Sequence, residues 1–208
     1  MRSCRCLRSY AVETIFPRMR PWNNWYHVMG NTYGTWLPGS PRGFRTEMRK
    51  LHVPYDYKHP PPKAKYEKLH EYAKSVMARP PVFLESREQR RRAVDELVRS
   101  LLRHDIPVAI ASVDRIHFHI LAPFPDLDPR RWVGLAKKES SHYCKQAGLG
   151  PKGGIWADGT ECKPITGPAH HENAFGYIAD HADRGAELWR HDQVPPLWDF
   201  DPESLRVD

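Results

Sequence analysis

Alternation of apolar and polar side chains predicts a β-strand over residues 115–122, which read Arg-Ile-His-Phe-His-Ile-Leu-Ala. Successive side chains of a strand point to opposite faces, so His117 and His119 would share one face while Phe118 lies on the other. We therefore expect one face of this histidine strand to enter the core. The other face would present two imidazoles about one pleat repeat apart.

Other stretches have the composition of strands. Residues 25–33 are rich in aromatic and β-branched side chains, and residues 107–113 form the short apolar run typical of a central strand. Residues 154–157 and 161–165 flank Asp158-Gly159, which is a strong turn signal and predicts a β-hairpin. The run at 107–113 leads directly into the histidine strand, so these two strands should be antiparallel neighbours.

Helical periodicity is clearest after residue 86. Ser86-Arg-Glu-Gln89 is a capping-box pattern, and it precedes an apolar stripe that includes Leu97 and Leu101. A second helix is predicted from Asp128-Pro129 to a point before Gly148, because proline favours the first turn and glycine the end.

Two further helices are predicted. Residues 168–185 open with Pro and close with Gly, with Phe175 and Ile178 on one stripe and Tyr177 and His181 on another. A weaker apolar stripe predicts a helix over residues 63–78, between two proline clusters.

This order of elements predicts an α+β fold with an antiparallel sheet and helices packed on one face. We expect a single domain over residues 22–190, with a Pro-rich and helical insertion at about 46–85. Residues 1–21 would be a loose basic arm, and residues 191–208 a C-terminal tail.

Charge narrows the class of partner. The chain has 208 residues and a formal net charge of +7, which favours a polyanionic partner, because lysine and arginine release condensed counterions when they neutralise phosphates. Nucleic acid is preferred over a membrane surface, since no segment approaches the apolar length needed to cross a bilayer. The four cysteines are too scattered for a zinc motif or a disulfide framework, which indicates a reducing cytosol and excludes a disulfide scaffold.

The histidine pair suits two ligands of one metal ion, since neutral imidazole is a common metal ligand. Two ordinary histidines on a solvated face are the alternative. The helix over 168–185 adds Tyr177 and His181, which are stacked one turn apart.

Together these motifs resemble the HUH endonuclease family, and most closely the IS200-like single-strand transposases and their REP-associated tyrosine transposase relatives. The resemblance implies a ferredoxin-like sheet with the site on its open face. It also implies that His117 and His119 bind a divalent metal, Mg²⁺ or Mn²⁺, that Tyr177 is the nucleophile, and that His181 is a third ligand. Members of the family commonly have Gln or Asn at this last position, so His181 is a departure.

The activity that the resemblance implies is cleavage and rejoining of single-stranded DNA near hairpins, through a 5′-phosphotyrosine intermediate. Such a transposase would work in the cytoplasm in association with the nucleoid, and both monomers and homodimers remain open. The candidates for DNA contacts lie in a turn-rich loop and on the helix after residue 128: Trp36, Arg42, Arg45, Lys137, Lys138 and Ser141. The alternatives are a Trp36 packed onto the sheet and ordinary surface lysines.

Other interpretations of the motifs stay open. Ligand softness alone favours Zn²⁺ or Mn²⁺ over Mg²⁺ at three imidazoles. A histidine-triad nucleotide hydrolase also uses alternating histidines on a strand, but its third alternate position is His, and here it is Leu121. A domesticated relative that binds DNA hairpins without cutting them is the more serious alternative.

Overall fold

The computed structural model describes residues 22, 24–40, 44–45, 52–53 and 63–191. The predicted basic arm over residues 1–21 and the loop residue Arg42 lie outside the described residues. Of the predicted tail over residues 191–208, only residue 191 is described.

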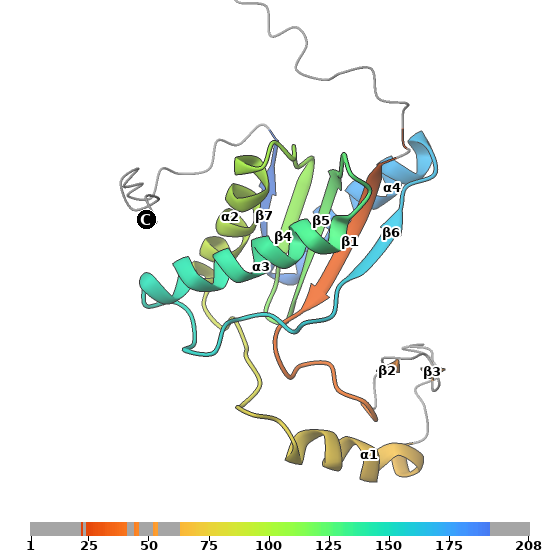
Figure 1. The fold of residues 1–208 in the computed structure, drawn as a ribbon. Helices are drawn as coiled ribbons and strands as arrows, with labels where there is room; N and C mark the ends of the chain where they lie inside the picture. Colours follow the sequence, from red (N-terminus) through yellow and green to blue (C-terminus); the bar gives the residue numbers. More distant parts are fainter. Residues whose placement is uncertain (1–21, 23, 41–43, 46–51, 54–62, 192–208) are drawn as a thin grey trace, which may run out of the picture.

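A five-stranded sheet forms the centre of the domain, and each neighbouring pair of strands is antiparallel (Figure 1). Its spatial order is β6 (Glu161–Pro164), β1 (Trp25–Asn31), β5 (His117–Pro123), β4 (Ile110–Val113) and β7 (Glu187–Arg190). The predicted α+β class and antiparallel sheet are confirmed. The histidine strand is β5, and it is hydrogen-bonded on both sides, to β1 and to β4.

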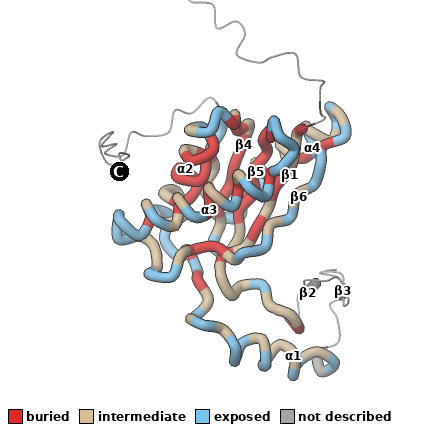
Figure 2. Tube along the Cα trace, viewed as in Figure 1, coloured by how far each residue is buried: buried red, intermediate tan, exposed pale blue. Residues whose placement is uncertain are grey.

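Helices cover both faces of this sheet. Helices α2 (Arg87–Arg103) and α3 (Pro129–Gln146) pack on one face, where Phe118 and Ile120 join their apolar residues in the main core (Figures 1 and 2). Helix α4 (Pro168–Ala179) packs through Ile178 on the opposite face, against Ile110 and Leu121. The prediction that the helices share one face therefore holds for α2 and α3 and is wrong for α4. The histidine face carries apolar residues of its own, and these require a cover.

The predicted helix starts are confirmed. The Ser86 hydroxyl accepts a hydrogen bond from the Gln89 backbone N–H at 3.1 Å, while the Gln89 side chain accepts one from the Ser86 N–H, so the capping box is complete. Asp128 caps α3, whose first residue is a proline. The helix predicted over residues 168–185 ends earlier, at Ala179, and a 3₁₀ turn, Ala182–Arg184, follows it.

The segment predicted as a hairpin is instead an interrupted edge strand. Residue Trp156 forms a bridge with Thr32, and β6 pairs with β1, so both segments run along the same neighbour. The interruption is held by Lys137, whose ammonium donates to the carbonyl oxygens of Asp158 at 3.0 Å and Gly159 at 3.3 Å. This long-range interaction, rather than a local turn, sets the path of the loop.

The segment predicted as an insertion contains β3 (His52–Val53) and α1 (Lys63–Ser75), which stands apart from the sheet in Figure 1. Strand β3 pairs with the short strand β2 (Phe44–Arg45), which precedes this segment. Helix α1 confirms the helix predicted within the insertion. No helix in the described part of the chain is long and apolar enough to cross a membrane.

Phe118, a residue of β5, belongs to the main core. It is fully buried, its ring meets the Trp156 ring edge-on at 5.0 Å between centroids, and it lies opposite Gly30 on β1. A Cβ atom at Gly30 would come within 2.7 Å of the Phe118 ring, so glycine is what allows this close approach.

We expect Phe118→Ala to lower the free energy of unfolding by about 3–5 kcal/mol, because it removes a large side chain from a filled core and leaves a cavity. Leu102→Ala is the control, since Leu102 is 37% exposed on α2 and should cost under about 1 kcal/mol. Urea denaturation of both variants measures the difference. Equal losses would mean that the facing of β5 has been assigned wrongly.

Candidate metal centre

Three histidines meet where the C-terminal end of α4 crosses the start of β5. His117, His119 and His181 each offer one ring nitrogen, and these nitrogens lie within 4.8 Å of one another. The His181 ring is 4.5 Å from that of His119 and 5.3 Å from that of His117, between centroids. These three side chains are close enough to hold one metal ion, as predicted.

Two of the imidazoles are oriented by oxygen acceptors. His117 Nδ1 lies 2.8 Å from Asp114 Oδ2, and His181 Nδ1 lies 2.8 Å from the carbonyl oxygen of Tyr177. An acceptor at Nδ1 places the proton on that nitrogen and leaves Nε2 with a free lone pair. The other carboxylate oxygen of Asp114 accepts from the backbone N–H groups of Ile116 and His117, both at 2.7 Å, so the turn itself fixes the carboxylate.

Of the three, His119 is distinguished by a buried ring nitrogen that has no partner in the described part of the chain. It is 3% exposed, and its buried Nε2 has no hydrogen-bond partner among the described residues. Its Nδ1 lies 3.0 Å from Nε2 of His27, a residue of β1 that is 7% exposed. A buried polar atom without a partner is unfavourable in a core and is what a metal ligand needs, so the residues present fit a metal ion.

Burial sets the protonation of these rings. It lowers the pKa of His27 to about 4, and the charges of Lys163 and His181 act in the same direction. Burial also lowers the pKa of His119, reinforced by His117, and that of His181, against the opposing hydrogen bond to the Tyr177 carbonyl. These imidazoles are therefore neutral at pH 7, which is the form that binds metals.

Asp114 behaves differently. Its burial raises the pKa of the carboxyl group, but the hydrogen bonds from His117 and from the backbone outweigh burial and hold the pKa below its usual range. A carboxylate is thus retained behind His117, where it strengthens the imidazole as a donor to a cation.

Tyr177 lies beside this cluster on α4. Its ring packs edge-on against the rings of His181 at 4.8 Å, His119 at 5.5 Å and His27 at 5.8 Å, between centroids, and the residue is 47% exposed. The structure therefore places Tyr177 against two of the three predicted metal ligands, His119 and His181, and His181 in turn packs against His117. An exposed phenol beside three neutral imidazoles could attack a phosphorus atom bound at the same site.

Sequence reasoning did not single out His27. Pairing places His27 opposite Leu121 and Met29 opposite His119, so the two histidines are diagonal neighbours on the same face of the sheet. The only available signal was a histidine inside the apolar stretch 25–33. Nothing local indicates that its partner lies 92 residues away.

The predicted DNA contacts are spread over the molecule. Trp36 is 38% exposed, and Lys138 is exposed on α3. Arg45 lies on β2, and its side chain is outside the described part, like all of Arg42. Because α3 covers the face opposite the histidines, the structure does not bring Lys138 to the candidate metal centre.

Lys137 and Ser141 both make contacts within the protein. Lys137 is 7% exposed, and its ammonium donates to the loop at residues 158–160, including Thr160 Oγ1 at 3.2 Å. The Ser141 hydroxyl accepts a hydrogen bond from the Ile155 N–H at 3.0 Å. Their DNA contacts stay a prediction, but both side chains already hold the segment between α3 and β6.

Substitutions of the neighbouring lysines Lys137 and Lys138 on α3 can distinguish a role in stability from a role in DNA binding. We expect Lys137→Met to cost about 1–3 kcal/mol of stability, because it removes the hydrogen bonds that the charged ammonium donates to the loop at residues 158–160. Lys138→Met should leave the melting temperature unchanged. If Lys138 contacts a phosphate, its loss should weaken DNA binding and reduce the salt dependence by about one unit of log–log slope. Thermal melting and fluorescence anisotropy at several salt concentrations measure both, and an unchanged affinity of Lys138→Met would remove it from the DNA surface.

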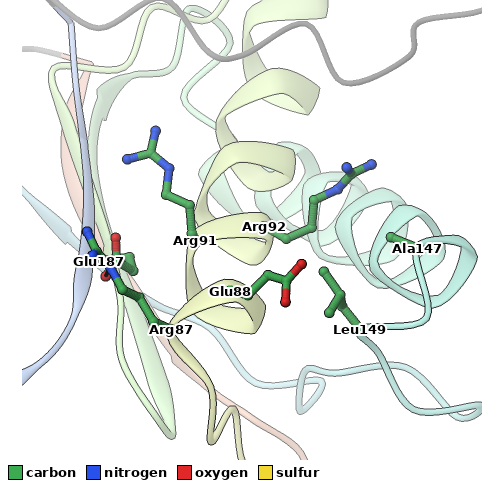
Figure 3. A pocket seen from close by; sticks show the side chains of 7 residues that line it. All are labelled: Arg87, Glu88, Arg91, Arg92, Ala147, Leu149 and Glu187. Carbon is green, nitrogen blue, oxygen red and sulfur yellow. Dashed lines mark hydrogen bonds and ion pairs between the residues drawn. The ribbon is translucent and has the colours of Figure 1, made fainter.

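A hollow of about 570 Å³ lies away from the histidines, between the first turn of α2, the loop after α3 and β7 (Figure 3). Its basic lining is neutralised: Arg87 pairs with Glu187 at 2.8 Å and Arg91 pairs with Asp95 at 2.8 Å. The hollow shares no residue with the metal centre, and its paired arginines do not favour an anion.

Comparisons of the chain with protein-family models, with curated proteins and with solved structures give no match. The geometry of the site is therefore what supports a function.

Proposed function

We propose that this chain is a metal-dependent single-stranded DNA endonuclease and strand transferase of the HUH type, similar to IS200-like and REP-associated tyrosine transposases. The proposal is supported chiefly by one observation, the packing of Tyr177 against His119 and His181, two members of the cluster of His117, His119 and His181 on one face of an antiparallel sheet. The basic balance of the chain supports a nucleic acid as the substrate.

In the proposed reaction the Tyr177 hydroxyl loses its proton and its oxygen attacks the scissile phosphorus atom. A bond forms between Tyr177 and the 5′ phosphate, the bond from phosphorus to the 3′ oxygen breaks, and that oxygen leaves as a 3′-hydroxyl after taking up a proton. A bound divalent metal would polarise the phosphate and stabilise the charge that develops on it. Attack of a second 3′-hydroxyl on the phosphotyrosine reverses these steps and joins two strands without ATP.

The family resemblance and the softness of the ligands are both compatible with Mn²⁺. The resemblance implies Mg²⁺ or Mn²⁺, whereas three imidazole nitrogens favour a softer ion than Mg²⁺. We therefore propose that Mn²⁺ supports the reaction at lower concentration than Mg²⁺ does.

A hairpin oligonucleotide with single-stranded flanks tests the function. Incubation of the protein with Mn²⁺ and 3′-labelled DNA should give a labelled adduct that survives denaturing electrophoresis, and EDTA should prevent it. A fully duplex oligonucleotide of the same sequence is the control and should give no adduct. Hairpin binding without any adduct, across a library of flanking sequences, would instead favour the non-catalytic DNA-binding module.

A further inference from the structure

Each of the three proposed ligand rings has its Nδ1 atom engaged within the protein. Asp114 occupies Nδ1 of His117, and the Tyr177 carbonyl occupies Nδ1 of His181. Both partners are oxygen atoms that only accept hydrogen bonds, so each fixes the tautomer with the Nε2 lone pair free. For His119 the corresponding partner is another imidazole, His27, which can either donate or accept.

The hydrogen bond between these two rings has two possible directions. If His27 Nε2 carries the proton and donates, His119 must carry its own proton on Nε2, which then has no partner and cannot bind a metal. If His119 Nδ1 donates, His27 Nε2 accepts and the His119 Nε2 lone pair is free. Only the second direction gives His119 the same tautomer as the other two ligands.

We propose that His27 is a positioning residue of the metal centre: its Nε2 accepts the hydrogen bond from His119 Nδ1–H and so directs the His119 Nε2 lone pair to the metal. This inference rests on the proposed metal site. His27 would thus do for His119 what Asp114 does for His117, from a different strand.

The position of His27 suits this role. It is 7% exposed, its ring centroid lies 5.1 Å from that of His119, and the two rings are tilted by 40°. It belongs to β1, the direct neighbour of β5, so backbone pairing holds the two rings in register. The structural alternative is that His27 only fills space beside Tyr177, in which case an aromatic ring without nitrogen would replace it.

Two substitutions at this position separate the alternatives. His27→Phe keeps a ring but removes the acceptor, and His27→Gln provides an amide oxygen that can accept from His119. We expect His27→Phe to weaken binding of Co²⁺ or Zn²⁺ to the protein by about 10–100-fold, and His27→Gln to restore most of that loss. His171→Phe is the control, since His171 packs against Trp22 and Trp25 outside the metal centre and should bind metal like the parent protein.

Isothermal titration calorimetry without DNA measures these affinities, so the result does not depend on cleavage. Normal metal binding by His27→Phe, or equal weakening in His27→Phe and His27→Gln, would overturn the positioning role while leaving the metal site intact. Failure of the parent protein to bind metal would overturn both the site and the role.

Tautomers read by ¹⁵N NMR of the parent protein give a second test that needs no variant. The proposal requires a protonated Nδ1 on His119, in the metal-free protein and with Zn²⁺ bound, and an unprotonated Nε2 on His27. A proton on His27 Nε2 in the Zn²⁺-bound protein would sink the proposal even if every variant failed to fold.

Discussion

Tyr177→Phe should abolish the covalent protein–DNA adduct completely while leaving DNA binding within about twofold of the parent value. The substitution removes only the hydroxyl group, and the ring keeps its edge-on contacts with His119 and His181. Because no other group in the proposed reaction forms the bond to phosphorus, the loss should approach the detection limit rather than a partial decrease.

The measurement is denaturing electrophoresis of the labelled hairpin substrate, with anisotropy for binding. Tyr72→Phe is the matched control, since Tyr72 is 66% exposed on α1 and loses the same atom away from the histidines. An adduct that persists in Tyr177→Phe would defeat the nucleophile assignment, whatever the metal does.

His119→Ala should remove both metal binding and cleavage. Of the three proposed ligands, His119 has the buried Nε2 atom that has no partner in the described part of the protein, and alanine offers no replacement. His181→Ala should have a milder result, because His117 and His119 still hold two coordination positions. We expect cleavage by His181→Ala to require a Mn²⁺ concentration at least about tenfold higher.

His170→Ala is the control for both variants. It lies on the same helix as Tyr177, but its Nδ1 accepts a hydrogen bond from the Thr166 N–H at 3.3 Å, near the N-terminal end of α4. Titrating Mn²⁺ in the cleavage assay compares the three proteins. If His170→Ala needs more Mn²⁺ for cleavage and His181→Ala does not, the assignment of His181 as the third ligand is wrong.

The sequence was sufficient where a local rule decides the structure. Alternation over residues 115–122 placed Phe118 in the core and the two histidines together, because a strand has no other way to arrange neighbouring side chains. Helical spacing placed Tyr177 next to His181, and their contact survives although α4 ends at Ala179, since Asp180 and His181 keep helical backbone angles.

The sequence alone was insufficient to predict contacts between residues that are distant in the chain. His27 gained its role through the register between β1 and β5, which no local pattern specifies. Lys137 looked like a surface lysine because helical periodicity does not show that its ammonium reaches the loop at 158–160. The side of the sheet that α4 covers was also missed, since apolar Ile110 and Leu121 give no sign of which helix buries them.

The three proposed ligand positions differ in how firmly the fold holds them. His117 and His119 belong to β5, which is paired on both edges, so their backbone should open to solvent only when the whole domain unfolds. His181 lies in the short turn after α4, close to a left-handed glycine, Gly185, and outside the sheet, so we expect its backbone to open locally at a lower free energy than that of β5. An ion shared between them would fasten that turn to the most protected strand. Amide hydrogen exchange around residues 177–186 should therefore slow on metal addition, while exchange in β5 stays as slow as before.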